Sequence, residues 1–386
     1  MTKFCKLLFA ALLCLSLASP ALADEIKIGL ATAQTGGLAS FDGPVVEGFH
    51  LAVDEINAAG GIGGKTKIVL VEKDVRSDAA QTAIAVQELL DEGVAVLVTP
   101  CDADPSFAAA GLADDAKVPA FSTCASSPTL PMMGGDYMFA NFPGDNIQAT
   151  VSAQYAHKQG YKVAYILYSP DSQYTMLPLY FGEVFAKLGG TVAGEGTYSM
   201  GQQDFSAEVT KIKSLEPKAD VIMTSAYEPD FPAFIRQLRA AGVDTPVIGS
   251  DGIDSPTTFS LGKSAEGVVF TTAGFPTPGS PLEKFDAKYE AKYGKPSETV
   301  FNGIGYDLGM VIQAAVVKAG STDPQAIRDA VADLEDVQGA TSKISYKGTM
   351  GMPVRQVSLI RVTDGKRELL GQPSPDPALV PEPRMN

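Results

Sequence analysis

The stretch VAVLVT at residues 94–99 decides the fold. It is an uninterrupted apolar run in which polar and apolar side chains do not alternate, which is typical of a strand buried on both faces of a parallel sheet. A predicted strand at 67–72 and a helix at 77–92 precede it, and a helix from about residue 106 and a strand at 119–122 follow it. This alternation of strands and helices predicts a doubly wound parallel sheet.

The alternation of strands and helices begins before residue 67, and a second series begins in the second half of the chain. IKIGL at residues 26–30 is a predicted strand, and the helix expected over 44–59 has Pro44 at its start, where proline costs little. After Pro143 a second series of strands and helices begins. The fold class we expect is therefore α/β, with two doubly wound parallel-sheet lobes that each bury a core.

Composition and motifs argue against several function classes. The chain has 386 residues and a formal net charge of −15, whereas nucleic-acid binders usually present a basic face. It has two histidines and lacks the Gly-x-Ser-x-Gly and His-Glu-x-x-His motifs. GGIGGKT at 60–66 resembles a phosphate loop, but Ala59 replaces the first glycine and the stretch follows a helix instead of a strand. We expect no enzyme activity, no cofactor and no metal.

Residues 1–23 have the features of an export signal. Two lysines precede an apolar run at 7–17, which is too short to cross a bilayer comfortably. The small-x-small sequence ALA at 21–23 then predicts cleavage before Asp24 and a periplasmic mature protein. An uncleaved membrane anchor and a lipoprotein attached through Cys14 are the alternatives. No later segment has 18 consecutive apolar residues, so we expect the mature chain to be soluble.

Cleavage would leave one pair of cysteines. Cys5 and Cys14 lie in the signal, and Cys101 and Cys124 remain, which favours a disulfide in an oxidising compartment. Closing that loop would stabilise the fold by roughly 3 kcal/mol in the chain-entropy model. Two buried free thiols are the alternative, and a metal site is disfavoured because neither histidine is near in sequence.

Several stretches resemble the branched-chain amino-acid binding proteins, the leucine/isoleucine/valine-binding family of periplasmic receptors for ABC importers. The most specific is GFHLAVDEINAAGGIGG at 48–64, which follows IKIGL at 26–30 and TG at 35–36. Shorter matches in the same order are DFS at 204–206, RQLRAAG at 236–242 and GYD at 305–307. Together they span nearly the whole mature chain.

The resemblance implies a type I periplasmic binding protein, a Venus flytrap without catalytic chemistry. Two lobes joined by three crossovers would close on a small molecule and deliver it to an inner-membrane permease, and we expect a monomer. Lobe 1 is predicted to comprise 24–144 and 275–351, and lobe 2 to comprise 145–274 and 353–370. Residues 371–386 contain five prolines and are predicted to form an extended tail without a core.

The family's ligand loops can be transferred onto lobe 1. The first corresponds to residues 101–104, where Asp102 and Ala103 would lie against the ligand and Ala103 replaces the usual serine. The second corresponds to 123–126, where Cys124 would offer its backbone and Ser126 its hydroxyl and N–H. Asp102 and its neighbour Asp104 have an alternative interpretation as loop caps.

The remaining transferred positions are an acid and four aromatic residues. Asp251 corresponds to the partner of the ligand's ammonium group, although an aspartate before a glycine could also be an ordinary turn residue. The aromatic walls correspond to Phe41, Tyr174, Tyr227 and Phe301. Phe41 and Phe301 could instead belong to the core, and Tyr174 could cover a loop.

The departures from the family pattern concern the ligand. Loss of the serine hydroxyl, with Asp102 and Asp104 nearby, gives a poorer site for a carboxylate. No arginine falls among the transferred positions, although Arg76 follows a strand end and could approach. Acids and aromatic walls suit an ammonium group, so the sequence predicts an amine or polar amide instead of leucine.

Two other functions stay open at this point. The protein could be a sensor subunit that presents its ligand to a membrane receptor, or a secreted enzyme on the same scaffold. The lack of catalytic motifs disfavours the enzyme, and the sequence does not separate sensing from transport.

Overall fold

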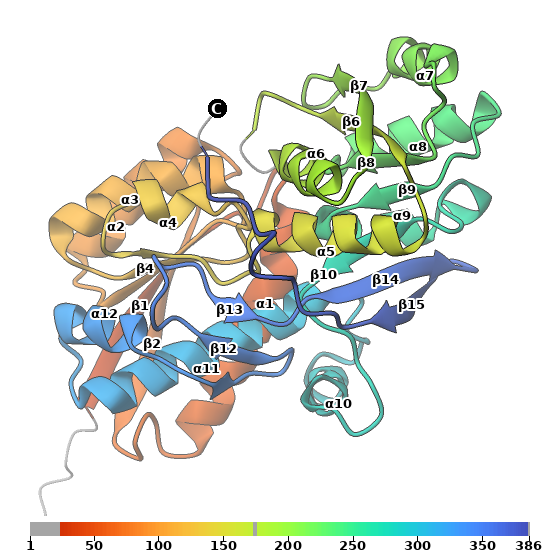
Figure 1. Cartoon of the computed structure of the whole chain (residues 1–386). Coiled ribbons are helices and arrows are strands. Elements are labelled where there is room, and N and C mark those ends of the chain that lie inside the picture. The colour runs from red at the N-terminus through yellow and green to blue at the C-terminus, as the bar shows by residue number, and fades with distance from the viewer. Residues whose placement is uncertain (1–23, 173–175, 385–386) are drawn as a thin grey trace, which may run out of the picture.

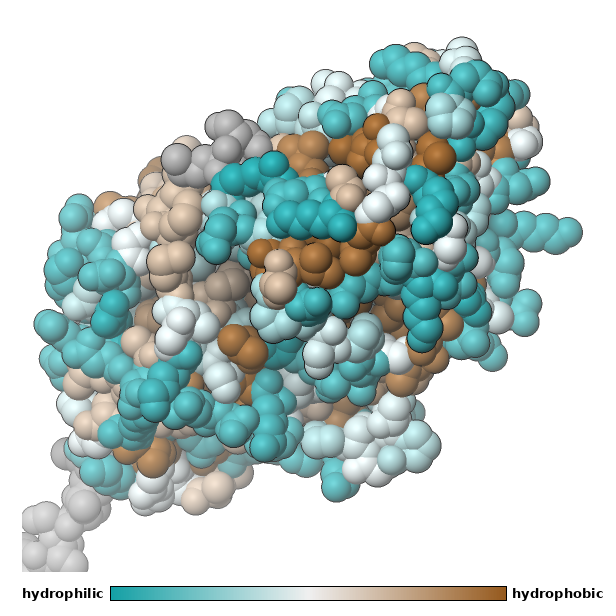
Figure 2. All heavy atoms as spheres, viewed as in Figure 1, coloured by the Kyte–Doolittle hydropathy of each residue, from teal (hydrophilic) through white to brown (hydrophobic). Residues whose placement is uncertain are grey.

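The computed structural model describes residues 24–172 and 176–384. The predicted signal peptide and Tyr174 lie outside the described residues. Figure 1 shows two lobes side by side, each with its own β-sheet flanked by helices. On the face shown in Figure 2, hydrophilic residues predominate and the apolar residues form separate areas.

The first lobe contains a five-stranded sheet in the order β2-β1-β3-β4-β5, and all neighbouring strands in it are parallel. VAVLVT supplies the central strand β3 (Val96–Thr99), whose four residues are all buried. The other strands are β1 (Asp24–Thr32), β2 (Thr66–Asp74), β4 (Ala120–Ser122) and β5 (Met138–Phe139).

Helices from both ends of the chain cover this first sheet. Leu308 and Ile327, from late helices, share one buried apolar cluster with Ile28 of β1 and Phe121 of β4. The helices of this lobe are α1 (Ala39–Ala58), α2 (Ala79–Asp91), α3 (Ala103–Ala116), α4 (Thr129–Met133), α10 (Pro281–Tyr293), α11 (Val300–Ala319) and α12 (Pro324–Ala332). A small antiparallel sheet joins them, made of β11 (Val337–Gln338), β12 (Lys343–Ser345) and β13 (Val354–Arg355).

The second lobe contains a seven-stranded sheet in the order β15-β14-β10-β9-β8-β6-β7. Its strands are β6 (Val163–Tyr168), β7 (Thr191–Thr197), β8 (Val221–Thr224), β9 (Val247–Gly249), β10 (Val269–Thr272), β14 (Ser358–Thr363) and β15 (Lys366–Gly371). The helical segments are α5 (Asp145–Lys158), α6 (Leu177–Lys187), α7 (Ser206–Ser214), α8 (Asp230–Ala240), α9 (Pro256–Phe259), η2 (Asp251–Ile253) and η3 (Gly262–Ser264). The five strands from β6 to β10 are parallel, and β14 and β15 add an antiparallel edge. The α/β class with two mainly parallel sheets is confirmed.

Two helices begin earlier than the sequence predicted. Helix α1 starts at Ala39, so Pro44 lies inside the helix and not at its first position. Proline removes only one backbone hydrogen bond there, and the helix brings Phe41 and Asp42 into the buried interior. Helix α3 starts at Ala103 because the Asp102 side chain accepts a hydrogen bond from the N–H of Asp104 at 3.2 Å and caps the helix.

Glycines let α1 and α11 pack in close contact. A Cβ atom on Gly48 would lie 1.7 Å from the carbonyl oxygen of Asn302, and one on Gly305 would lie 1.8 Å from the carbonyl oxygen of Val45. Neither backbone atom can move aside without distorting its helix. These two glycines are part of the stretches that carry the family resemblance.

Helix α11 is long and apolar enough, by length and composition, to cross a membrane. In the structure 72% of its most apolar 18-residue window is buried inside the protein. Its apolar side chains therefore form part of the core of the first lobe.

The C-terminal segment has no helix or strand over residues 372–384, and it packs along the second lobe. In Figure 1 it runs from β15 across α5 toward the junction of the lobes. Leu379 packs against an apolar cluster of the second lobe, and Asn146 donates a hydrogen bond to the carbonyl of Pro381 at 2.9 Å. Arg384 forms an ion pair with Glu183 of α6 at 3.1 Å. Proline-rich sequence lacks the periodicity that predicts such packing.

A candidate ligand site between the lobes

A small cavity lies where the two lobes meet. Its volume is about 20 Å³, and its lining comes from both lobes: Leu38, Phe41, Cys101, Asp102, Tyr227, Asp251, Gly252 and Phe301. Asp102, Tyr227 and Asp251 follow β3, β8 and β9, at the carboxyl ends of parallel strands where ligands of open α/β sheets bind. Five of the nine predicted site residues therefore line one cavity.

Three aromatic rings form one wall of the cavity. The Phe41 ring meets the Phe301 ring edge-on with 5.5 Å between centroids, and meets the Tyr227 ring edge-on at 5.8 Å. Phe41 and Phe301 begin helices of the first lobe, whereas Tyr227 belongs to the second. The aromatic contact therefore joins the lobes.

A hydrogen bond crosses the same junction. The hydroxyl of Tyr227 donates to a carboxylate oxygen of Asp102 at 3.4 Å. Burial, together with the charge of Asp104, raises the pKa of Asp102 to about 6. Asp102 also caps α3. The alternative interpretation of Asp102 as a cap is therefore confirmed, and the same residue lines the cavity.

Asp251 lies at the start of η2, and only 2% of it is exposed. The side-chain amide of Gln148, in α5, donates to its carboxylate at 2.8 Å. The same amide donates to the carbonyl of Pro143, and its oxygen accepts from the Thr271 hydroxyl. Gln148 thus connects Asp251 to a crossover between the lobes.

Asp42 organises the first-lobe side of the site, and sequence analysis missed it. Its fully buried carboxylate accepts hydrogen bonds from the N–H of Ala33 at 2.7 Å, the N–H of Cys101 at 2.9 Å and the hydroxyl of Thr123 at 2.7 Å. These donors lie on the loops after β1, β3 and β4. Burial raises the pKa of Asp42 to about 7, against the effect of its hydrogen bonds.

The predicted disulfide between Cys101 and Cys124 is confirmed, and the alternative of two free thiols is wrong. The two Cα atoms are 4.4 Å apart, within the range for an unstrained bridge. The bridge links the loops after β3 and β4, the two loops to which the family resemblance assigns ligand contacts.

Other predicted residues lie near the cavity without lining it. Ala103 is the buried first residue of α3, Cys124 is occupied by the disulfide, and Ser126 is fully buried. Arg76 is exposed and does not line the cavity.

Asp145, at the first position of α5, is a second buried acid that sequence analysis missed. Its side chain is 1% exposed, and its backbone N–H donates to the carbonyl of Ser126 at 2.8 Å. Burial and the charges of Asp251 and Asp102 hold its pKa well above the usual value, while the Ser126 hydroxyl acts in the opposite direction. Its position directly after Pro143-Gly144, at a lobe crossover, was the available signal.

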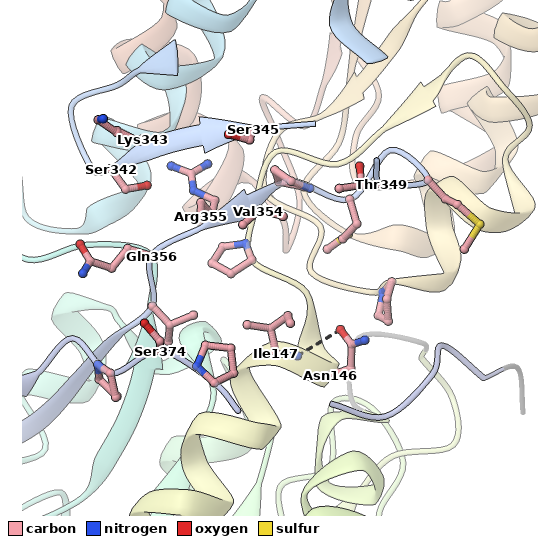
Figure 3. Close-up of a pocket in the computed structure, with 18 of the residues that line it drawn as sticks. Asn146, Ile147, Ser342, Lys343, Ser345, Thr349, Val354, Arg355, Gln356 and Ser374 are labelled. Atoms are coloured by element: carbon pink, nitrogen blue, oxygen red, sulfur yellow. Dashed lines mark hydrogen bonds between the residues drawn. The ribbon is translucent and has the colours of Figure 1, made fainter. Parts of the chain in front are cut away.

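Among the larger cavities outside the aromatic site, two adjoin the junction of the lobes. One of about 260 Å³ shares Phe41 and Phe301 with it. The other, of about 680 Å³, lies against the crossovers. Figure 3 shows Arg355 and Ser342 on one side of that cavity, and Asn146, Ile147 and Ser374 on the other.

The crossovers beside this cavity are tied to the first lobe by a buried ion pair. Arg355 pairs with Asp307 of α11 and also donates to the carbonyl of Asn141 and to the hydroxyl of Thr341. Both charged side chains are fully buried. The network therefore joins the segments before α5 and before β14.

Two lobes, each with a parallel sheet whose carboxyl edge faces a shared cavity, define a two-lobed solute-binding protein. The chain belongs to the periplasmic binding protein family, whose model matches residues 25–367. That family resides in the periplasm.

Curated relatives and solved structures agree with this assignment. The Leu/Ile/Val-binding protein homolog 3 of Brucella melitensis is 30% identical over 90% of this chain and 94% of its own. The Leu/Ile/Val-binding protein BraC3 of Rhizobium johnstonii is 29% identical over 89% of this chain and 93% of its own. The leucine-binding protein LivK of Thermotoga maritima is 28% identical, with a TM-score of 0.83 over 91% of this chain and 99% of its own. The binding protein LivJ of Streptococcus pneumoniae, solved with isoleucine, is 28% identical, with a TM-score of 0.81 over 91% of this chain and all of its own.

Proposed function

We propose that this protein is the solute-capturing component of an ABC importer and holds its solute between Asp102, Asp251 and the aromatic wall. The observation that carries this proposal is the cavity to which both lobes contribute. The names of the relatives describe Leu/Ile/Val-binding proteins. The protein delivers its solute to an inner-membrane permease.

The solute carries an ammonium or polar amide group. Asp251 accepts its N–H donors, and Phe41, Tyr227 and Phe301 cover its apolar part, because aromatic faces attract cations. Ala103 supplies no hydroxyl to a ligand carboxylate. Cys124 and Ser126 contribute from the adjoining loop, and Tyr174 remains a proposed contact.

Capture requires the lobes to separate and close again. A cavity of about 20 Å³ holds about one water molecule, far less than the roughly 300–1,000 Å³ of ordinary ligand pockets. The lobes move as rigid bodies about the crossovers near 144, 274 and 352. Contacts made only in the closed form shift the population toward it.

The remaining parts of the proposal follow from the same assignment. The mature protein begins at Asp24 after signal cleavage and acts as a monomer. It performs no catalysis and binds no nucleic acid. Intact-mass measurement of protein from the periplasm tests the cleavage site.

The central test identifies what the protein carries. Native mass spectrometry of protein purified without refolding should reveal a small nitrogen-containing solute, and small-angle scattering should show contraction when that solute is returned to the stripped protein. Asp251→Asn should weaken its binding by about 30-fold or more, because truncating a buried charge pair costs roughly 2–5 kcal/mol. The exposed Asp244→Asn is the matched control. Binding without contraction, or an unaffected Asp251→Asn, would overturn the proposal.

A further inference from the structure

Among the described residues, the charge of the buried Asp145 side chain is stabilised by little besides the nearby Ser126 hydroxyl. Its side chain is 1% exposed, and neither carboxylate oxygen makes a hydrogen bond of ordinary geometry. The Asp42 carboxylate, in contrast, accepts three. An acid buried with so little compensation destabilises the protein by itself. Buried acids whose pKa is strongly perturbed are enriched at functional sites.

The charged neighbours of Asp145 are other acids of the candidate site. Asp145 lies about one turn before Gln148 on α5, and Gln148 donates to the Asp251 carboxylate at 2.8 Å. The charges of Asp251 and Asp102 both disfavour ionisation of Asp145. Asp102 and Asp251 line the aromatic cavity. The backbone bond from Asp145 to Ser126 holds it at the second ligand loop. Three carboxylates from both lobes and a crossover therefore converge on one place.

This convergence sets a condition on the charge of the solute. A zwitterionic amino acid brings one positive and one negative charge, and its carboxylate would add a fourth acid to the group. A net cation instead favours ionisation of the acids around it and removes part of their mutual repulsion. The aromatic wall adds cation–π attraction for an organic cation.

A second cavity, beside the aromatic wall, is also lined mainly by acidic residues. It shares Phe41 and Phe301 with the candidate site and has a volume of about 260 Å³. Its charged lining residues are Glu47, Glu228, Asp254, Glu298 and Lys295. An acid-lined approach raises the local concentration of cations and repels anions.

We propose that Asp145 contacts the solute and, with Asp102 and Asp251, selects a small organic cation that has no free carboxylate. This inference rests on the proposed capture function and narrows it to primary amines, amino-acid amides and related cations. Asp145 is then a specificity-determining residue, and the zwitterionic parent amino acids are discriminated against by charge.

The test compares probes that differ only in the carboxylate. Calorimetry at pH 7 measures stripped protein with leucine, leucinamide and isopentylamine, and with the glycine, alanine and phenylalanine counterparts. The best amide or amine should bind at least tenfold more tightly than its parent amino acid. The proposal is wrong if no amine or amide binds more tightly than its parent.

Asp145→Asn separates a ligand role from a structural one. The variant should lower the affinity for the best cation at least tenfold and reduce the preference for cation over zwitterion, while its melting temperature stays equal or rises. Asp323→Asn, at the start of α12, is the control and should change neither. A lower melting temperature with an unchanged preference would assign Asp145 a structural role and overturn the inference.

Small-angle scattering distinguishes failure of the charge preference from failure of the capture mechanism. If leucine contracts the particle and binds more tightly than leucinamide, capture stands and the charge preference is wrong. If a bound probe leaves the particle size unchanged, the capture mechanism itself fails.

Discussion

Replacing Asp42 by alanine should strongly destabilise the first lobe. The Asp42 carboxylate is 0% exposed and accepts three hydrogen bonds of 2.7–2.9 Å from three different loops. In Asp42→Ala the N–H groups of Ala33 and Cys101 and the hydroxyl of Thr123 lose their acceptor together. None of them has a replacement acceptor on an alanine side chain.

The magnitude follows from those three donors. A buried donor left unsatisfied costs about 1–3 kcal/mol, and water entering the vacated space recovers part of this cost. We therefore expect Asp42→Ala to lower the free energy of unfolding by about 3–5 kcal/mol. Asp42→Asn keeps one acceptor oxygen for Cys101 and Thr123 and loses only the bond from Ala33, so about 1–2 kcal/mol is expected.

Urea unfolding followed by circular dichroism measures both variants. Asp54→Ala, on the exposed face of the same helix, is the control, because the Asp54 side chain is 67% exposed and pairs with Lys292 at the surface. A change below about 1 kcal/mol is expected there. The loss of one buried donor costs about 1 kcal/mol or more. A free energy of unfolding for Asp42→Ala within about 1 kcal/mol of the wild-type value would therefore contradict this prediction. An asparagine variant as unstable as the alanine variant would contradict it as well.

Further outcomes are expected for the buried ion pair, the disulfide and Asp102. Arg355→Met should lower the free energy of unfolding in urea by about 3–5 kcal/mol, because it leaves Asp307 buried and unpaired. The double variant Arg355→Met/Asp307→Asn should lose less stability than the single variant. An equal or larger loss in the double variant would contradict this explanation. Reduction of the Cys101–Cys124 bridge should lower stability by roughly 3 kcal/mol, and an unchanged melting temperature with free thiols detected would refute that. The pKa of Asp102 is raised to about 6 beside Asp104 and Tyr227. The carboxylate therefore gains a proton as the pH falls through 6, and calorimetry should show weaker binding of leucinamide at pH 5 than at pH 7.5, by up to about tenfold. Constant affinity would exclude ionised Asp102 from binding. Since this pKa is raised on folding, the same group lowers stability as the pH rises from about 4 to about 6.

The fold could be predicted because its signals are local. A short apolar run such as VAVLVT and the glycines that end helices act over a few residues, and they identified β1 to β4 along the chain. The two-residue strand β5 and the order of the strands within the sheet were not predicted. The start of α1 could not be predicted, since Pro44 is tolerated inside the helix only because tertiary packing compensates for the lost backbone bond. The packing of Leu379 in the C-terminal segment likewise depends on an apolar surface far away in sequence.

The candidate site was predictable in part for a similar reason. Phe41, Tyr227 and Asp251 were found because a family pattern places them by sequence position. Asp42 and Asp145 were missed, since an aspartate inside or before a helix looks like an ordinary solvent-facing or capping residue. These two side chains are buried because loops distant in sequence come together around them. Sequence periodicity does not predict burial of that kind.

The contact between α1 and α11 also affects the geometry of the candidate site. Gly48 and Gly305 admit no side chain, because a Cβ atom at either would lie within 2 Å of a backbone oxygen. A side chain at either position would push the two helices apart. Phe41 and Phe301 lie in the first turns of these helices, and their rings are 5.5 Å apart between centroids. Two glycines far from the cavity thus set the spacing of two rings in its wall.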